Sequence, residues 1–298
     1  MDSSNAILSR FKVSLRLIAA AVIIVTSMLA VTGVGAACSK KTNPVAVLMG
    51  IAPEQTGHFA YWAIADLNKD EDLWPIYDGF KNSSDAPQLE ELVEVLAIVK
   101  DSARILGSDN AATLEAPVTV LRAKFDTKYV EGRLETLEYS RSAHRNVDIW
   151  IAGNGQPYRP VALLSGKMLI GSVSELKLCI DTAKNKADSF YDNPYIRILA
   201  NRLPKGIVVD VHRTSASSAQ SYAELVAYGK SYSKVKSDLL KVTAVYLFGD
   251  GQAAGTASEP IKENLSVGFQ DVKVDRDDNL VIATGKISIS DFAQSLEF

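Results

Sequence analysis

The clearest chemical motif in the sequence is a glycine-containing segment that matches the dinucleotide fingerprint Gly-x-Gly-x-x-Ala. It is Gly249-Asp250-Gly251-Gln252-Ala253-Ala254, it follows an apolar stretch that predicts a strand, and Asp271 lies near the spacing of a ribose-binding acid. The chemistry needs a helix that begins at the glycines, because the amide groups of its first turn hold the pyrophosphate. Gly255 and Pro260 interrupt the next stretch. We therefore predict a loop there and assign no cofactor-binding residues and no cofactor.

Two other stretches carry oxygen ligands at alternate positions, which is the pattern of a looped calcium site. They are Asp66, Asn68, Asp70 and Asp72, and Asp275, Asp277 and Asn279. The sixth and twelfth positions of such a loop are Gly and Glu, and neither stretch has them. We predict an exposed acidic loop for the first stretch and a hairpin turn for the second, with no metal ligands in either.

The three histidines, His58, His144 and His212, are isolated in the sequence. No His-x-His or His-Glu-x-x-His spacing is present, so no local zinc site is predicted. A metal site would need ligands from distant segments. His58 begins one predicted strand and His212 ends another, and we expect the two imidazoles to lie at opposite ends of these strands. No metal ligand is assigned.

Nucleophilic catalysis has no supporting pattern either. Cys179 lies in an apolar stretch that predicts a helix, without a neighbouring group that would lower its pKa, so we expect a buried thiol. No Gly-x-Ser-x-Gly elbow is present. Ser231–Lys234 and Ser108–Asn110 match two motifs of penicillin-recognising enzymes, but in reversed order and without Lys-Thr-Gly. We assign no catalytic residue, and the sequence favours a protein that is not an enzyme.

One group of aromatic residues is a candidate binding face. Tyr61, Trp62, Trp74 and Tyr77 lie close together in the sequence. They combine apolar rings with polar groups, a composition that suits contact with sugars or proteins. The same residues are also typical of a core, and both interpretations stay open.

The N-terminus has the pattern of an export signal. Arg10, Lys12 and Arg16 precede an apolar run from Leu17 to Val34, and small residues follow. A basic start, an apolar centre and small residues at a cleavage site are the features of a secretory signal, and the basic residues favour a cytoplasmic start. We expect residues 1–37 to be a signal peptide or membrane anchor and the rest to be extracytoplasmic.

Cys38 is the expected site of lipid attachment. The residues before it, Ala36 and Ala37, resemble the lipobox of bacterial lipoproteins, with Gly35 in place of the usual Leu. In that family the Cys becomes the first mature residue and carries the acyl chains. Two other outcomes stay open, namely ordinary cleavage after Ala37 and an uncut anchor, since Leu17–Ala37 is long enough to span a bilayer. The expected partner is a membrane, held by a lipid or by this helix.

The composition is that of an ordinary globular protein. The chain has 298 residues, of which 47% are hydrophobic and 22% charged, which suffices for one large domain or two small ones. The net charge is −3, and removal of residues 1–37 makes it −5. An acidic chain of this kind gives no attraction to nucleic acid.

Alternating strands and helices must position any site that exists, after a leader or linker over residues 38–56. Strands are predicted for His58–Asp66, Pro117–Phe125, Val147–Ala152, Pro160–Ser165, Met168–Gly171, Ile207–His212, Val242–Phe248, Leu265–Val274 and Leu280–Ile289. Helices are predicted for Pro87–Leu106, Thr127–Tyr139, Val173–Lys184, Pro194–Arg202 and Ser215–Ser233, with a short one after Ser290, and Leu73–Phe80 is predicted to be a short helix or a turn. This order predicts an α+β fold with mainly antiparallel sheets and packed helices.

Two parts of the chain repeat the same order of elements. Val118–Leu134 and Leu280–Leu296 each run from a strand through an aspartate into a helix. We therefore interpret residues 57–204 and 205–298 as two related α+β halves.

The layout over residues 38–298, with its lipoprotein-type signal and the Phe125-Asp126 strand-to-helix junction, resembles a poorly characterised family of exported bacterial lipoproteins. The resemblance implies an envelope-associated protein and carries over no functional residues. We expect a membrane-tethered, extracytoplasmic module without catalysis that binds an envelope protein or wall component. A hydrolase with a site assembled from distant residues and a small-molecule carrier are the alternatives.

Overall fold

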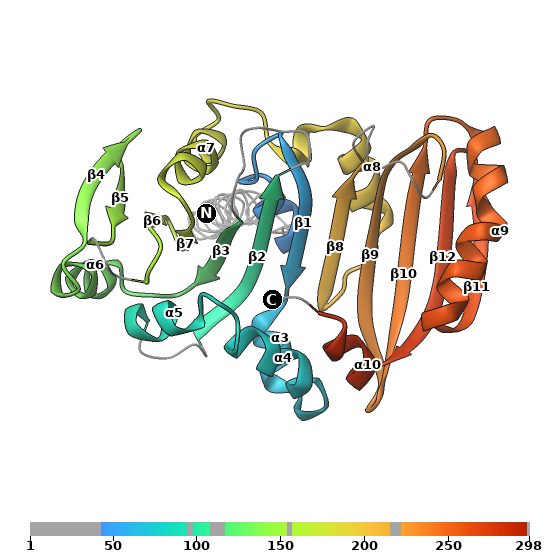
Figure 1. Ribbon diagram of the computed structural model, residues 1–298, viewed down its shortest axis with the longest axis horizontal. Helices are drawn as coiled ribbons and strands as arrows, with labels where there is room; N and C mark the ends of the chain where they lie inside the picture. Colours follow the sequence, from blue (N-terminus) through green and yellow to red (C-terminus); the bar gives the residue numbers. More distant parts are fainter. Residues whose placement is uncertain (1–42, 94–97, 108–116, 154–156, 215–221, 297–298) are drawn as a thin grey trace, which may run out of the picture. The chain divides into compact units, whose positions relative to one another are not determined.

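A computed structural model describes residues 43–93, 98–107, 117–153, 157–214 and 222–296. The strands are β1 (Thr56–Trp62), β2 (Val99–Gly107), β3 (Val118–Ala123), β4 (Ser140–His144), β5 (Val147–Ile151), β6 (Val161–Leu164), β7 (Lys167–Ile170), β8 (Val208–Arg213), β9 (Leu225–Lys236), β10 (Leu239–Phe248), β11 (Gln270–Asp277) and β12 (Leu280–Ser288). Within the described residues all of them join one antiparallel sheet, in the order β11-β12-β10-β9-β8-β1-β2-β3-β7-β6-β5-β4 (Figure 1).

Helices occur between many of the strands. They are α2 (Pro44–Met49), α3 (Ile64–Lys69), α4 (Trp74–Lys81), α5 (Ala86–Leu92), α6 (Thr127–Thr136), α7 (Val173–Ala183), α8 (Pro194–Arg202), α9 (Gly251–Gly268) and α10 (Ile289–Gln294), with the short 3₁₀ turns η1 (Glu71–Leu73) and η3 (Phe190–Asp192). The expected α+β class with a mainly antiparallel sheet is therefore confirmed.

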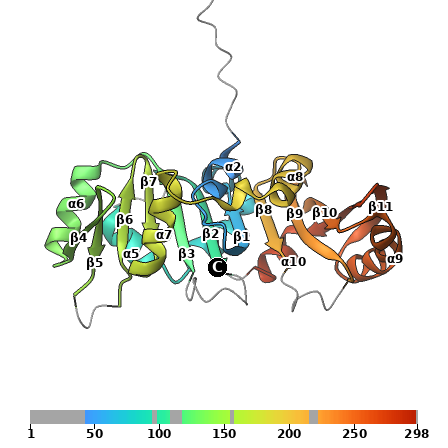
Figure 2. The same ribbon diagram turned by 90° about the horizontal axis from the view of Figure 1, so that it is seen from above.

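The helices cover both faces of the sheet. On one face, which we call the α8 face, α2, α7 and α8 bury side chains such as Leu48, Leu176 and Leu199. On the other, the α10 face, α3 to α6 and α10 pack over one part of the sheet and α9 covers another part, over β10 and β12. Figure 2 shows α8 and α10 on opposite sides of the sheet near β8.

Strand β1 shows why the sequence between residues 56 and 62 is so apolar. Phe59 and Tyr61 belong to the core of the α8 face, whereas Ala60 and Trp62 belong to that of the α10 face. Successive side chains of a strand point to opposite faces. A central strand with both faces covered therefore needs apolar side chains at nearly every position.

Many predicted elements are confirmed to within a few residues. The helices α4, α6, α7 and α8 and the strands β3, β5, β6, β7, β8, β10 and β12 lie where the sequence placed them. Local capping explains much of this success. Asp126, Ser172 and Asn193 each accept a hydrogen bond from a first-turn N–H group of the helix that follows, which is a signal readable from the sequence.

Two predicted helices and one predicted strand are wrong. The helix predicted for Pro87–Leu106 stops at Leu92, and the chain forms β2 from Val99. The part of Ser215–Ser233 that the structure describes contains the start of β9. In both, apolar spacing that fits a helix also fits a strand, and pairing with two neighbours in the sheet overrides the local preference.

The third error concerns Leu265–Val274, predicted as one strand. Residues up to Gly268 belong to α9, and β11 begins at Gln270. The predicted strand from His58 also ends early, because α3 starts at Ile64. The region expected to be a linker contains α2, and β4 was not predicted at all.

The strands on the two sides of the central β1–β8 pair follow a similar order. Each side begins with three strands paired in chain order, β1-β2-β3 and β8-β9-β10, and β1 and β8 pair with each other. By this order the counterpart of β3 is β10, whereas the sequence pattern matched it with β12. The division into related halves at residues 57–204 and 205–298 stays a prediction.

An ion pair between the buried Asp85 and the partly exposed Arg159 helps to attach α5 to the sheet. The carboxylate of Asp85 accepts hydrogen bonds from Nη2 of Arg159, at 2.6 and 2.7 Å, and from Oγ1 of Thr119 on β3 at 2.5 Å. Gln88 of α5 adds hydrogen bonds to the main chain of Arg159 in both directions. Removal of the carboxylate would leave the guanidinium partly desolvated without its anion, which is unfavourable.

We expect Asp85→Ala to lower the free energy of unfolding by about 2–3 kcal/mol, because the partly exposed Arg159 loses its buried carboxylate partner. Urea unfolding followed by circular dichroism measures the change. Asp78→Ala is the matched control, because Asp78 forms an exposed ion pair with Lys81 and its loss should leave the midpoint almost unchanged. Equal midpoints for the two variants would contradict this account.

Candidate metal centre

The two histidines expected to lie apart are direct neighbours in the sheet. Strands β1 and β8 are antiparallel, with His58 opposite His212 and Ala60 opposite Asp210. An antiparallel pair places the start of one strand beside the end of the other. The expectation failed because it compared the strands as equivalents in two halves and did not consider them paired with each other. Figure 1 shows β1 and β8 side by side in the sheet.

Asp210 lies between the two imidazoles. Nε2 of His58 donates a hydrogen bond to Oδ1 of Asp210, and Nε2 of His212 donates to Oδ2 at 2.8 Å. One ligand atom from each of the three side chains can be chosen so that all lie within 4.8 Å of one another. The side chains are 31%, 26% and 26% exposed for His58, Asp210 and His212, so solvent reaches them although the backbone is in the middle of the sheet.

The electrostatics of the cluster favour an ionised carboxylate. Burial of Asp210 raises its pKa, but the hydrogen bonds from His212 and His58, and the charge on these rings, outweigh burial and hold the pKa well below its usual value. The carboxylate therefore offers two anionic oxygen atoms at neutral pH.

A row of stacked rings supports His212 from the side. The ring centroids of His58 and His212 are 4.0 Å apart, those of His212 and Tyr228 4.5 Å, and those of Tyr228 and Tyr246 5.9 Å, with the planes of each pair within 18°. Tyr222 contacts Tyr246 edge-on at the far end. Burial, with the charge of Asp210, raises the pKa of Tyr228 to about 12. The stacking of Tyr228 on His212, and of His212 on His58, restricts the orientation of both imidazoles.

Two imidazole nitrogens and one carboxylate oxygen form a ligand set for a divalent transition metal. Neutral imidazole binds metal through Nε2 when its hydrogen is on Nδ1. Metal–ligand bonds of about 2.0–2.2 Å require only small movements of side chains that already converge. Three protein ligands also leave coordination positions for water or another ligand.

Sequence reasoning missed Asp210 as well as the proximity of the histidines. A usable signal was present in Asp210-Val211-His212, because residues two apart on a strand share a face. The contribution of His58 had no local signal. It depends on a pairing between segments about 150 residues apart.

The third histidine forms a simpler contact. Nε2 of His144 lies 2.9 Å from Oδ1 of Asp181, and Nε of Arg145 donates to the same oxygen at 3.0 Å. The group has one histidine and one carboxylate, with a cation in place of a further ligand. It therefore serves as an internal comparison for the cluster around Asp210.

The candidate aromatic binding face does not form a shared surface. Tyr61, Trp62 and Tyr77 are buried, and only Trp74 is substantially exposed, at 47%. Tyr61 and Trp62 belong to cores on opposite faces of the sheet because they are adjacent on β1. The core interpretation of these aromatic side chains is the one that the structure supports.

The glycine motif is followed by a helix, so the predicted loop is wrong. Helix α9 begins at Gly251, and its N–H group at Ala253 donates to Oδ1 of Asp250 at 2.8 Å. Its buried side chains are Ala254, Ala257, Ile261 and Leu265. This apolar stripe, readable from the sequence, stabilises the helix against the cost of Pro260.

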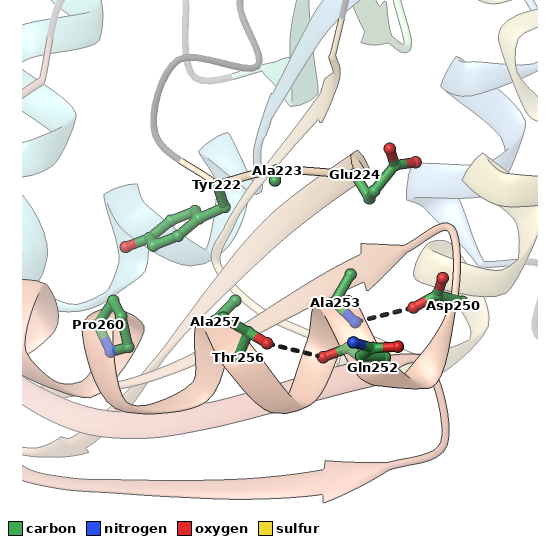
Figure 3. A pocket seen from close by; sticks show the side chains of 9 residues that line it. All are labelled: Tyr222, Ala223, Glu224, Asp250, Gln252, Ala253, Thr256, Ala257 and Pro260. Carbon is green, nitrogen blue, oxygen red and sulfur yellow. Dashed lines mark hydrogen bonds between the residues drawn. The ribbon is translucent and has the colours of Figure 1, made fainter.

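A cavity of about 410 Å³ lies beside the start of α9, between Tyr222 and the helix (Figure 3). The residues that line it include Glu224 and Asp250. These two carboxylates disfavour a pyrophosphate, and Asp250 already accepts from a first-turn amide. A helix therefore follows the glycine motif, but the carboxylates beside its first turn are unfavourable for binding a pyrophosphate.

The two acidic stretches differ from each other. Asp66 and Asn68 lie on α3, and Nζ of Lys234 lies 2.6 Å from Asp70 and 2.5 Å from Asp72, so the expected acidic loop is instead helix and 3₁₀ turn with a lysine counter-ion. The second stretch is the predicted hairpin turn, because β11 and β12 pair from Asp277 and Leu280.

Two further candidate residues, Ser231 and Cys179, are buried. Ser231 is buried and donates a hydrogen bond to the carbonyl of Pro204. Cys179 is completely buried in the core of the α8 face. Cys38 and Ser108–Asn110 lie outside the described residues.

Comparisons with protein-family models, with curated proteins and with solved structures found no match for this chain. The geometry of the described residues is therefore the basis for the functional argument that follows.

We expect Cys179 to be unreactive in the folded protein, because burial, aided by the charge of Glu175, raises the pKa of its thiol to about 12. The raised pKa keeps the thiol protonated, so roughly one in ten thousand is ionised at pH 8. In a Cys38→Ser variant, Ellman's reagent should detect one thiol in guanidinium chloride and none in native buffer. Rapid labelling of the native variant would contradict the burial.

Proposed function

We propose that this protein is exported, remains tethered to a membrane of the bacterial envelope, and binds a divalent transition-metal ion through His58, Asp210 and His212. The observation that carries the metal-binding proposal is the convergence of two Nε2 atoms on one carboxylate in the middle of a rigid sheet. Side chains held on paired strands keep their relative positions better than side chains on loops.

The ligand types restrict the metal. Imidazole suits zinc, copper, iron and nickel, whereas an all-oxygen set would suit calcium or magnesium. Two nitrogens and one carboxylate oxygen occur together in zinc sites and in non-haem iron sites. We take zinc as the probe because it undergoes no redox change and tolerates three or four protein ligands.

The tether is supported by the sequence rather than by the fold. The basic residues before residue 17, the apolar run and the small residues before Cys38 favour export and lipid attachment. Among the described residues no helix is long and apolar enough to cross a membrane. An envelope protein or wall component as a further partner stays a prediction.

We expect the protein to bind one zinc ion, because three ligand side chains already converge. The measurement is isothermal titration calorimetry on the purified full-length Cys38→Ser chain, in which an exposed thiol cannot contribute. Zinc at 100 times its dissociation constant should add about 2.7 kcal/mol to the free energy of unfolding. His58→Asn, Asp210→Asn and His212→Asn should each weaken zinc binding by roughly tenfold or more.

His144→Asn is the matched control, because His144 also hydrogen bonds to an aspartate but has no second histidine beside it. It should leave zinc affinity unchanged. Zinc binding of equal affinity in the wild type and the His58→Asn/His212→Asn double variant would overturn the proposal. Thermal melts of each metal-free variant show whether a loss of binding reflects unfolding.

We expect the wild-type chain to incorporate labelled palmitate in bacterial cells that express it, and Cys38→Ser to lose the label. Detergent-phase partitioning followed by autoradiography measures both. Cys179→Ser should be labelled like the wild type because Cys179 lies in the core. An unlabelled wild-type chain that stays in the membrane fraction would show an uncut anchor instead of a lipoprotein.

A further inference from the structure

The sheet register places two cations in the row that contains Asp210. Across four strands this row runs Arg104 on β2, Ala60 on β1, Asp210 on β8 and Lys230 on β9. Residues opposite each other in adjacent strands lie on the same face. Arg104 and Lys230 therefore lie on the α10 face with the candidate metal ligands, one on each side of them.

Neither cation has an anionic partner within the described part of the chain. Arg104 and Lys230 are both half-buried. No carboxylate of the described residues forms an ion pair with either of them, although Asp210 is next to Lys230 in the ladder. Both oxygens of Asp210 instead accept hydrogen bonds from the imidazoles.

An anion stabilises a half-buried cation because it offsets the cost of desolvation. The described residues offer Arg104 and Lys230 no ion-pair partner, so a bound anion could take this role. The spacing makes a shared ligand feasible. Adjacent strands lie about 4.8 Å apart, so Lys230 is one strand and Arg104 two strands from Asp210. Between Arg104 and Asp210 lies Ala60, whose side chain is small and buried.

We propose that the metal bound at His58, Asp210 and His212 takes a small oxyanion as an additional ligand, with Lys230 and Arg104 holding its other oxygens. This inference rests on the proposed metal-binding function. The ligand class is a phosphate or carboxylate, since both present several oxygens to a metal and to cationic donors. The metal supplies a coordination position and the two side chains supply charge and direction.

The arrangement assigns separate roles to the residues. His58, Asp210 and His212 hold the metal, whereas Lys230 and Arg104 contact only the oxyanion. Variants of the two cations should therefore reduce oxyanion binding without a change in metal affinity. A site in which the cations served only the stability of the sheet would not show this separation.

The test uses the full-length Cys38→Ser chain loaded with one equivalent of cobalt, with inorganic phosphate as the probe. Cobalt reports changes in its ligands through its visible absorption spectrum. Phosphate should change the spectrum in a saturable way, and Lys230→Gln and Arg104→Gln should each raise the half-saturating phosphate concentration by about tenfold. Calorimetric titration with cobalt should give the same affinity for these variants as for the wild type.

Lys241→Gln is the matched control, because Lys241 is an exposed lysine of the neighbouring strand β10 whose position in the register places it on the α8 face. It should behave like the wild type. Cobalt binding without any spectral response to phosphate, or an equal response in all variants, overturns this inference and leaves the metal proposal standing. Absence of cobalt binding overturns both. Acetate in place of phosphate distinguishes carboxylate from phosphate ligands.

Discussion

The pairing of β1 with β8 is the constraint on which the rest of the structure depends. Among the described strands, this ladder alone joins the side of the sheet that ends at β4 to the side that ends at β11. Its register also puts His58 opposite His212 and Ala60 opposite Asp210. A slip of one residue in a strand moves every side chain to the other face. The candidate metal centre and the continuous sheet therefore depend on the same hydrogen bonds.

The burial of the neighbouring residues fixes that register. Phe59 and Tyr61 fill the core of the α8 face while Ala60 and Trp62 fill that of the α10 face. A different register would expose large apolar side chains on one face and bury polar ones on the other, at a cost of several kcal/mol for each polar group left without a partner. The hydrophobic side chains thus hold in place a polar cluster to which they contribute no ligand.

The cluster itself resolves a conflict between burial and charge. A carboxylate such as Asp210 in the middle of a sheet is unfavourable unless it accepts hydrogen bonds, and two imidazoles supply them. The stacked ring of Tyr228 then restricts His212. A group of side chains that is held together in this way needs little reorganisation to bind a cation, and such preorganisation is what makes a binding site effective.

The sequence by itself determined what depends on near neighbours. Helix α8 follows from Asn193 and Pro194, α7 from the capping pair Ser172 and Glu175, and the β11–β12 turn from its Asp and Asn residues. The predicted export signal is likewise a local pattern. Where helical and strand spacings coincided, as in β2 and β9, the local pattern was ambiguous.

Only the tertiary structure decided which distant segments meet. His58 and Asp210 are separated by about 150 residues, and nothing near either of them in the sequence records the other. The same is true of Arg104 and Lys230, which share a row only because four strands align. Strand pairing between distant segments is selected by the burial of the whole sheet, and the free energy of that burial is not a property of any short stretch of sequence.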